Sequence, residues 1–194
     1  MTTRAGESYG ERGMTWVDRL GVWLSQRAIR RWLPERGELE VLELGCGYHA
    51  RTLAALPSSV RRATGVDFRL SPALHADARL HLREGSIEDV LPDLPTANYD
   101  VVLLISVLEH LADPLGALCQ TRRVMRPGGR LLINVPTWLG KPFLEFSAFR
   151  LGWSPAVEMD DHKMYYAKRD LWPLLVRAGF RPSEIRLRYH KFGL

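Results

Sequence analysis

The spacing of hydrophobic and polar positions changes repeatedly along the chain, and this alternation predicts the architecture. From residue 40 onward, short apolar runs typical of buried strands are separated by helical or turn segments. We predict strands near residues 40–44, 62–67, 79–83, 99–105 and 130–135. Such alternation requires crossover connections, so the predicted fold class is α/β, with a mostly parallel sheet and helices on both faces.

A helix is predicted ahead of the first strand, because apolar residues recur there at helical spacing. Pro34 and Gly37 end the pattern. The predicted core-facing stripe consists of Val17, Leu20, Leu24, Ala28 and Trp32. Trp16 and Trp23 lie off this stripe, which leaves a contact with a substrate or a partner chain open for them.

The clearest predicted helix follows the fourth strand and has signals at both ends. It begins at Asp113, which precedes Pro114 and is suited to capping the first turn. Its apolar residues, Met125 among them, lie towards one side, and Pro127-Gly128-Gly129 stops it.

The last predicted elements are a helix and a strand. The helix begins at Asp170, where Pro173 is tolerated because it falls in the first turn, and Gly179 closes it. The strand spans Glu184 to Tyr189.

Length and composition suit one domain. The chain has 194 residues, of which 46% are hydrophobic and 25% charged, enough for one sizeable core. We assign residues 1–13 to a polar N-terminal tail and residues 14–194 to the domain. Within it, residues 137–167 hold seven of the 18 aromatic residues, so this insertion is a candidate lid over an acceptor site.

Hydropathy, cysteine and charge patterns narrow the class of protein. No apolar run approaches the roughly 20 residues of a membrane span, and no secretion signal is visible, so we expect a cytoplasmic protein. Cys46 and Cys119 indicate neither a disulfide framework nor a metal site. The net charge of +5 is spread along the chain and favours an acidic substrate or a polyanion only weakly.

The stretch VLELGCGYHA, residues 41–50, ends the first strand in a glycine-rich loop. Gly45, Gly47 and Ala50 fit the pattern that holds a dinucleotide pyrophosphate, so an NAD(P)-dependent oxidoreductase is one interpretation. Glu43 argues against it, because a carboxylate at the end of this strand repels a pyrophosphate and attracts a cation.

A second acid, Asp67, ends the second strand 20 residues after Gly47. A carboxylate there is suited to accept both ribose hydroxyls of a nucleotide. Together, Glu43 and Asp67 describe a nucleoside that carries a cation. S-adenosylmethionine is the common metabolite of that description.

Five ordered blocks make the chain resemble the class I S-adenosylmethionine-dependent methyltransferases. They run from Val41 to Pro136 and read VLELGCG, GVD, EGSIEDV, YDVVLLISVLEHLADP and MRPGGRLLINVP. The resemblance implies a Rossmann-like fold. Members usually end with an antiparallel pair of strands, and we expect the final, seventh strand to be missing here. A truncated or non-catalytic cofactor-binding subunit therefore stays open beside an enzyme.

The resemblance implies a methionine-binding end of the cofactor site. Gly45-Cys46-Gly47 would let the backbone approach the methionine moiety, and Glu43 would hold the loop and the ammonium group. The backbone around Ile105 and Ser106 would meet the amino end of the cofactor.

At the adenosine end, the resemblance implies that Phe68 packs against the adenine and that Ile87 lies over the purine. Ser86 departs from the family, because many relatives have an aspartate there that accepts the adenine amino group. A serine hydroxyl makes only a weaker, neutral hydrogen bond. Cofactor affinity is then lower, or Glu88 or Asp89 substitutes.

Catalysis does not strictly require a dedicated residue, since methyl transfer from a sulfonium is an in-line displacement that depends on alignment. An acceptor hydroxyl would need a general base. His110 is the first candidate, because the loop after the fourth strand borders the methyl group in this fold; its alternative role is to fix that loop. His162, in the run from Glu158 to Lys163, is the second, and we expect no metal ion.

The acceptor is the least determined feature. Its candidate contacts are the aromatic residues Trp138, Phe146, Tyr165 and Tyr166. We predict methylation of a small molecule or glycan, with oxygen as the methylated atom, and expect no nucleic-acid partner because no nucleic-acid motif is visible. A homodimer through the aromatic insertion is left open.

Overall fold

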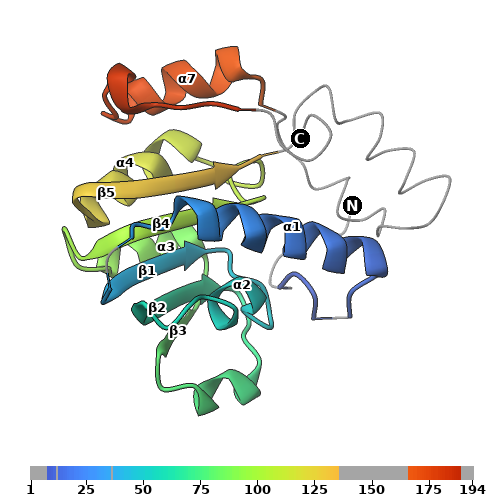
Figure 1. The fold of residues 1–194 in the computed structure, drawn as a ribbon. Helices are drawn as coiled ribbons and strands as arrows, with labels where there is room; N and C mark the ends of the chain where they lie inside the picture. The colour runs from blue at the N-terminus through green and yellow to red at the C-terminus, as the bar shows by residue number, and fades with distance from the viewer. Residues whose placement is uncertain (1–7, 12, 36, 136–165, 189–194) are drawn as a thin grey trace, which may run out of the picture.

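Five parallel strands form the centre of the protein, and helices cover both faces of the sheet (Figure 1). The structure is a computed structural model that describes residues 8–11, 13–35, 37–135 and 166–188. This architecture confirms the predicted α/β class. No helix in the described part is long and apolar enough to cross a membrane.

The strand order places β1 in the middle of the sheet. The strands are β1 Leu39–Leu44, β2 Val60–Asp67, β3 Leu80–Glu84, β4 Tyr99–Ile105 and β5 Met125–Asn134. They lie in the order β3-β2-β1-β4-β5, and each neighbouring pair is parallel. Because the chain progresses in opposite directions on the two sides of β1, the carboxyl ends of β1 and β4 flank the point where such folds bind ligands.

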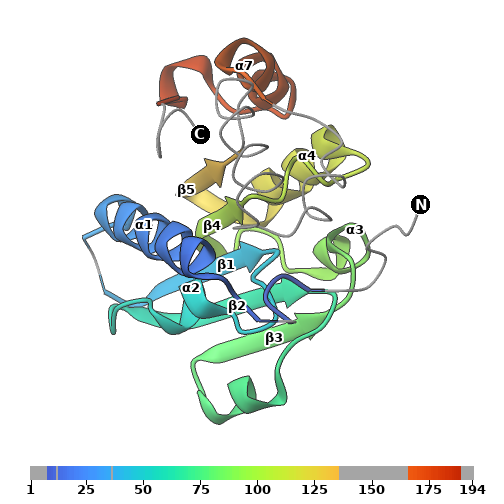
Figure 2. The ribbon, with the colours of Figure 1, turned by 90° about the vertical axis from the view of Figure 1, so that its right-hand side faces the viewer.

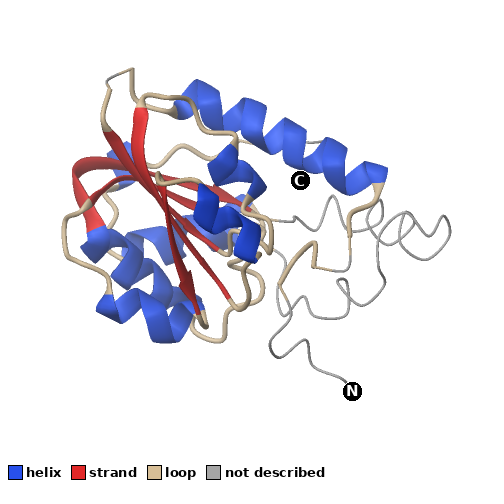
Figure 3. Cartoon of the chain, turned by 90° about the horizontal axis from the view of Figure 1, so that it is seen from below, coloured by secondary structure: helices blue, strands red, loops and turns tan. Residues whose placement is uncertain are grey.

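The helices divide between the two faces of the sheet (Figures 2 and 3). They are α1 Trp16–Trp32, α2 Arg51–Ala54, α3 Ile87–Val90, α4 Pro114–Val124 and α7 Lys168–Arg177, with short 3₁₀ turns η1 Pro72–Ala76, η2 Leu91–Asp93 and η4 Pro182–Glu184. On β4, Val101 and Leu103 pack in the core layer that holds the buried residues of α1 and α2, whereas Val102 and Leu104 pack in the layer of α3, α4 and α7. Burial on both faces explains the continuous apolar runs of the strands.

Helix α1 forms where the sequence predicts it, but the buried face is not the predicted stripe. Thr15 and Asp18 form a capping box at its start. The fully buried side chains are Ser25, Ile29 and Leu33, whereas Leu20 is 46% exposed. The prediction chose the longest apolar row, but tryptophan and leucine lie on more than one side of this helix, and docking on the sheet selected another row.

The junction between α4 and β5 differs from the prediction. Asp113 caps the helix as expected, accepting a hydrogen bond of 2.9 Å from the Gly116 N–H. The helix ends at Val124, however, and Met125 already belongs to β5. Strand register shifts between the Met125 and Arg130 pairings with β4, so Pro127-Gly128-Gly129 lies within an irregular stretch of the strand instead of stopping the helix.

The predicted position of Pro173 is wrong. Helix α7 begins at Lys168, two residues before the predicted start at Asp170, so Pro173 lies inside the helix and not in its first turn. Asp170 instead accepts a hydrogen bond of 2.9 Å from the Ala167 N–H. A capping acid in the first turn was thus taken for the start itself.

The predicted strand from Glu184 to Tyr189 is also wrong in its described part. Glu184 belongs to η4, and residues 185–188 are irregular and pair with no strand. Ile185 is 8% exposed and Leu187 packs against the same core layer. The alternating burial that suggested a strand therefore arises from packing, without a ladder of backbone hydrogen bonds.

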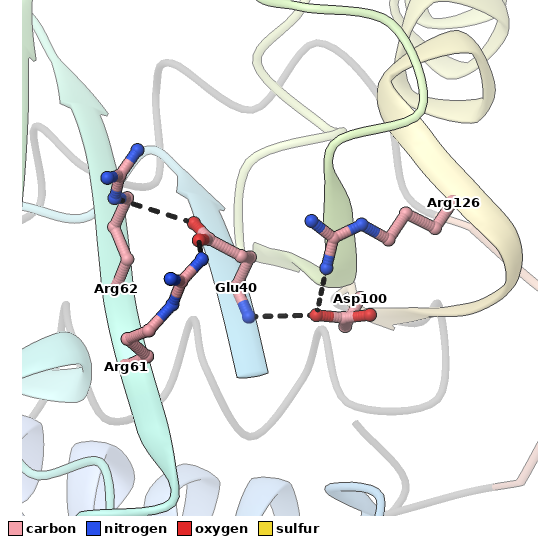
Figure 4. Close-up of polar contacts among 5 residues, drawn as sticks. All are labelled: Glu40, Arg61, Arg62, Asp100 and Arg126. Atoms are coloured by element: carbon pink, nitrogen blue, oxygen red, sulfur yellow. Dashed lines mark hydrogen bonds and ion pairs between the residues drawn. The ribbon is translucent and has the colours of Figure 1, made fainter. Parts of the chain in front are cut away.

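An ion network closes the amino ends of the central strands (Figure 4). The carboxylate of Glu40 lies 2.6 Å from Arg61 and 3.6 Å from Arg62. Asp100 accepts a 2.9 Å hydrogen bond from the Glu40 N–H and lies 2.7 Å from Arg126. Both acids are at most 3% exposed, and paired guanidinium groups offset the cost of burying them.

Candidate functional site

The glycine loop after β1 is held against the end of β2. The N–H groups of Gly45 and Cys46 both donate to the Val66 carbonyl, at 2.8 and 3.1 Å. Gly45 has a φ of 75°, and a β-carbon there would collide with the Val107 side chain. Glycine is therefore required at this position both for the left-handed backbone and for the close approach of the loop after β4.

Asp67 ties the loop to β2 and is 8% exposed. Its Oδ2 accepts a 2.6 Å hydrogen bond from the Gly47 N–H, and its Oδ1 accepts one of 2.9 Å from the Phe68 N–H. Each carboxylate oxygen has two lone pairs, so hydroxyl donors can still bind the same group. The acid predicted for the ribose thus also sets the position of the loop.

Glu43 lies at the same end of β1 and is 2% exposed. Burial raises its pKa to about 8; a hydrogen bond with Thr52 acts in the opposite direction, and the charge of Asp67 raises the pKa further. Among the described residues, no basic side chain stabilises the Glu43 carboxylate, and its Oε2 has no hydrogen-bond partner. Within the described part of the chain, the group that acts on the Glu43 charge is thus a second acid and not a base.

Cys46 is buried between these acids and is unsuited to nucleophilic chemistry. Burial raises the pKa of its thiol well above the ordinary value, and the charges of Glu43 and Asp67 act in the same direction. Because the reactive form of cysteine is the thiolate, we assign Cys46 a packing role in the loop.

The predicted adenosine residues lie along the exits of β2 and β3. Phe68 is 46% exposed directly after Asp67, which leaves its ring accessible for stacking. Ile87 is 8% exposed and packs in the core layer of α3. Ser86 caps α3: its hydroxyl accepts from the Asp89 N–H at 3.0 Å and lies 2.7 Å from the Asp89 carboxylate. Ser86 and Asp89 thus form one polar unit, and a contact of either residue with the adenine stays a prediction.

The loop after β4 approaches the glycine loop from the other side. Ser106 has a φ of 55° and is exposed, and its N–H donates 2.8 Å to the Asn134 carbonyl. Ile105, the last residue of β4, is partly buried. His110, four residues on from Ser106, is partly buried in the turn that its own N–H closes on the Val107 carbonyl.

Glu109, beside His110, is a buried acid that the sequence reasoning missed. It is 1% exposed, burial raises its pKa to about 8, and neither oxygen has a hydrogen-bond partner among the described residues. Tyr166 is 3% exposed, and its hydroxyl lies 3.5 Å from the Leu108 carbonyl. Tyr166 therefore packs beneath this loop; contact with an acceptor stays a prediction.

The segment at residues 8–11, predicted to belong to a polar tail, packs on the glycine loop (Figure 2). The Tyr48 N–H donates 2.9 Å to the Tyr9 carbonyl, and a β-carbon on Gly47 would lie 3.1 Å from the same oxygen. Ser8 is 3% exposed and accepts 2.7 Å from the Arg69 N–H. The sequence at residues 8–11 is typical of a turn, but it contains no information about which distant residues this turn contacts.

Several predicted residues lie outside the described part of the chain, namely Trp138, Phe146, His162 and Tyr165. Among the residues that are described, no three His, Cys, Asp or Glu side chains come close enough together to hold a metal ion.

Comparison with known proteins agrees with this geometry. Residues 42–133 match the family model described as a methyltransferase domain. A probable S-adenosylmethionine-dependent methyltransferase of Mycolicibacterium smegmatis is 32% identical over 163 residues, which cover 80% of this chain and 57% of that protein. A ubiquinone biosynthesis O-methyltransferase of Cereibacter sphaeroides is 29% identical over 78% of this chain and 64% of its own length. The chain thus spans about three fifths of these relatives.

The fold also matches solved structures. An S-adenosylmethionine-dependent methyltransferase from Archaeoglobus fulgidus superposes with a TM-score of 0.63 at 20% identity, over 82% of this chain and 69% of the other. Residues 42–133 therefore carry a methyltransferase domain. Beyond that stretch the chain is similar to S-adenosylmethionine-dependent methyltransferases in sequence and shares their fold.

Proposed function

We propose that this protein transfers the methyl group of S-adenosylmethionine to an oxygen atom of a small molecule or glycan. The observation that carries the proposal is the pair Glu43 and Asp67, buried at the carboxyl ends of adjacent strands with the glycine loop between them. A pyrophosphate would meet two acids there, whereas a nucleoside with a cationic end complements both.

The residues at the carboxyl ends of the strands fit this cofactor. Asp67 would accept the ribose hydroxyls, and Phe68, exposed beside it, would stack on the adenine. Glu43 and the backbone of Ser106 would receive the ammonium group. The Ser106 N–H already donates to Asn134, so its carbonyl would be the group that accepts from the ammonium donor.

When bound, the cofactor supplies an electrophilic methyl group on a positively charged sulfur. The protein contributes alignment, since Gly45 and Gly47 hold the loop and Asp67 fixes the loop to β2. His110 would accept the proton that an acceptor hydroxyl loses as its oxygen bonds to the methyl carbon and the carbon–sulfur bond breaks. Imidazole is the side chain that most often carries out such a proton transfer.

Oxygen as the methylated atom is supported by the relative from Cereibacter sphaeroides, which is named an O-methyltransferase. At 29% identity this support concerns the class of atom and not the acceptor molecule.

Calorimetric titration with S-adenosylmethionine and with NAD tests the ligand. We expect heat of binding only with the former, and loss of that heat in Asp67→Ala. Asp77→Ala is the matched control, because Asp77 lies at the surface and pairs with Arg79. Binding of NAD alone would contradict the proposal.

Methyl transfer is tested separately, with methyl-labelled cofactor and fractionated cell extract. The expected result is S-adenosylhomocysteine together with a labelled product that mass spectrometry identifies as a methyl ether or ester. His110→Ala should slow turnover of such a hydroxyl acceptor without weakening cofactor binding. Tight binding without any labelled product would favour the non-catalytic alternative.

A further inference from the structure

The exposed side of α1 has an unusual composition. Among the side chains of this helix that the structure describes, the exposed ones are all arginine, tryptophan or leucine. These residues are Trp16, Arg19, Leu20, Trp23, Arg27, Arg30, Arg31 and Trp32. The helix contains one acid, Asp18, and the Thr15 cap already engages its carboxylate at 2.7 and 2.8 Å. The exposed side is therefore apolar and basic, with no acidic residue.

Its apolar residues form one row along the helix. Trp16, Leu20 and Trp23 follow at steps of four and three residues, so they lie on one side of the helix. They are 60%, 46% and 53% exposed. The Arg27 guanidinium lies 6.0 Å from the centre of the Trp23 ring, so cationic groups border the row directly.

A basic depression adjoins this row. It has a volume of about 520 Å³ and lies between α1 and the start of α2. Trp23 forms part of its wall, and its ionisable side chains are Arg19, His49 and Arg51. The charge of the helix surface thus continues onto the neighbouring element, without an acid in the lining.

We propose that this surface, defined by Arg19, Leu20, Trp23, Arg27 and Arg51, docks onto a bilayer that contains anionic phospholipids. A helix that lies in the membrane interface buries tryptophan and leucine at the level of the headgroups, while arginine binds anionic lipid. The inference is independent of the proposed methyl transfer, since it needs neither cofactor nor acceptor.

The charge and the apolar residues of this surface favour an anionic bilayer over a second copy of the chain or a nucleic acid. In an isologous dimer through the same surface, the arginines of one copy would face those of the other without acids to pair with. A nucleic acid would use the arginines but would gain little from a leucine in the middle of the row. An anionic bilayer pairs with the arginines and also buries the tryptophan and leucine side chains.

The orientation also suits access to the site. In Figure 1 the first turn of α1 lies towards the carboxyl ends of the strands, where the glycine loop is. A bilayer on this surface would therefore lie beside the end of the sheet that carries the glycine loop.

Sedimentation with phosphatidylcholine vesicles tests the proposal, with or without about one third phosphatidylglycerol. We expect the whole 194-residue chain to sediment with the anionic vesicles and to be released by high salt. Leu20→Ser/Trp23→Ser should weaken binding roughly tenfold or more through lost apolar burial. Arg19→Gln/Arg27→Gln should weaken it by a similar factor and remove the preference for anionic lipid.

Matched controls lie on α7. Trp172→Ser replaces a tryptophan that is 39% exposed, and Arg169→Gln/Arg177→Gln removes two exposed arginines; neither should alter sedimentation. All replaced side chains are exposed, so unfolding temperatures should stay close to that of the parent protein.

Three outcomes would overturn the proposal. The first is no sedimentation with anionic vesicles, or equal sedimentation with neutral ones. The second is a solution dimer that Leu20→Ser/Trp23→Ser dissociates, which would identify the surface as a contact between copies. The third is retention by a nucleic-acid duplex that requires Arg19 and Arg27 but is indifferent to Leu20 and Trp23.

Discussion

Two glutamates on β1 lie three residues apart in opposite surroundings. Glu40, at the amino end, is 2% exposed and paired with Arg61 and Arg62 (Figure 4). Glu43, at the carboxyl end, is equally buried, but its charged neighbour is Asp67, and its pKa rises to about 8. At the amino end the protein itself supplies the opposite charges, whereas at the carboxyl end the charge that acts on Glu43 is a second acid.

The largest effect is expected for Gly45→Ala. This substitution strains the glycine loop at the carboxyl end of β1 and leaves the amino end of the strand unchanged. The left-handed backbone disfavours alanine, and the new β-carbon meets Val107. Together these should lower the free energy of unfolding by about 3 kcal/mol and abolish cofactor binding. Gly128→Ala is the control, because Gly128 has a φ of 76° but no atom within 4 Å of its β-carbon position. Equal losses in denaturant unfolding would contradict the predicted collision.

Asp67→Ala should act on the ligand more than on the fold. Loss of two charge-assisted hydrogen bonds to the ribose should reduce cofactor affinity at least about a hundredfold. Calorimetry measures this loss, with Asp77→Ala as the surface control. An affinity unchanged within twofold would place the ribose elsewhere.

Asp100→Ala, at the amino end of β4, should affect folding stability more than cofactor binding. It leaves the buried Glu40 N–H and Arg126 without their partner, which should cost about 2 kcal/mol of folding stability. Cofactor affinity should stay unchanged once the variant is folded. Asp93→Ala, at an exposed position, provides the baseline for denaturant unfolding. A large loss of affinity would show that the two ends are coupled.

Glu43 should make cofactor affinity depend on pH. A bound cation favours the carboxylate, so binding releases a proton from a group whose pKa is about 8 in the free protein. Affinity should therefore increase as pH rises from 6 towards about 8, by up to about fiftyfold. Glu43→Gln should flatten this dependence in calorimetric titrations, whereas Glu109→Gln should preserve it; the opposite pattern would assign the proton to Glu109.

The smallest effect concerns stability and Glu109. Its pKa rises from 4.5 to about 8 in the folded protein, so the folded state binds the proton more tightly. Its contribution to stability is complete below pH 4.5 and is lost as pH rises through about 8. Glu109→Gln should reduce this loss in free energies of unfolding measured between pH 5 and 8, by at most about 1.4 kcal/mol per pH unit. An unchanged profile would mean that Glu109 is ionised when folded.

Local patterns predicted most strands closely, because a run such as Val101 to Leu104 is buried on both faces and carries its own signature. They failed where packing overrode them. Ile185 is buried without any strand, and α1 buries Ile29 instead of Leu20. When apolar residues lie on several sides of a helix, the sequence pattern does not predict which side packs on the sheet.

Much of the candidate site was readable, because its groups follow the ends of strands. The glycine loop, Glu43 and Asp67 were all predicted. The structure joins Asp67 to the loop through its hydrogen bond with Gly47, and the charge of Asp67 acts on Glu43. Glu109 and Tyr9 were missed, since the burial of the first and the contact of the second depend on residues far away in the sequence.

The sequence by itself determined the order of strands along the chain and the resemblance to a family, together with the cofactor that this resemblance implies. These follow from short-range spacing and from residue chemistry. Tertiary structure alone decided which acids are paired. Glu40 and Glu43 look alike in LEVLEL, yet parallel neighbours bring arginines to the first and Asp67 to the second. Charge compensation depends on distance in space, which the spacing along one strand does not contain.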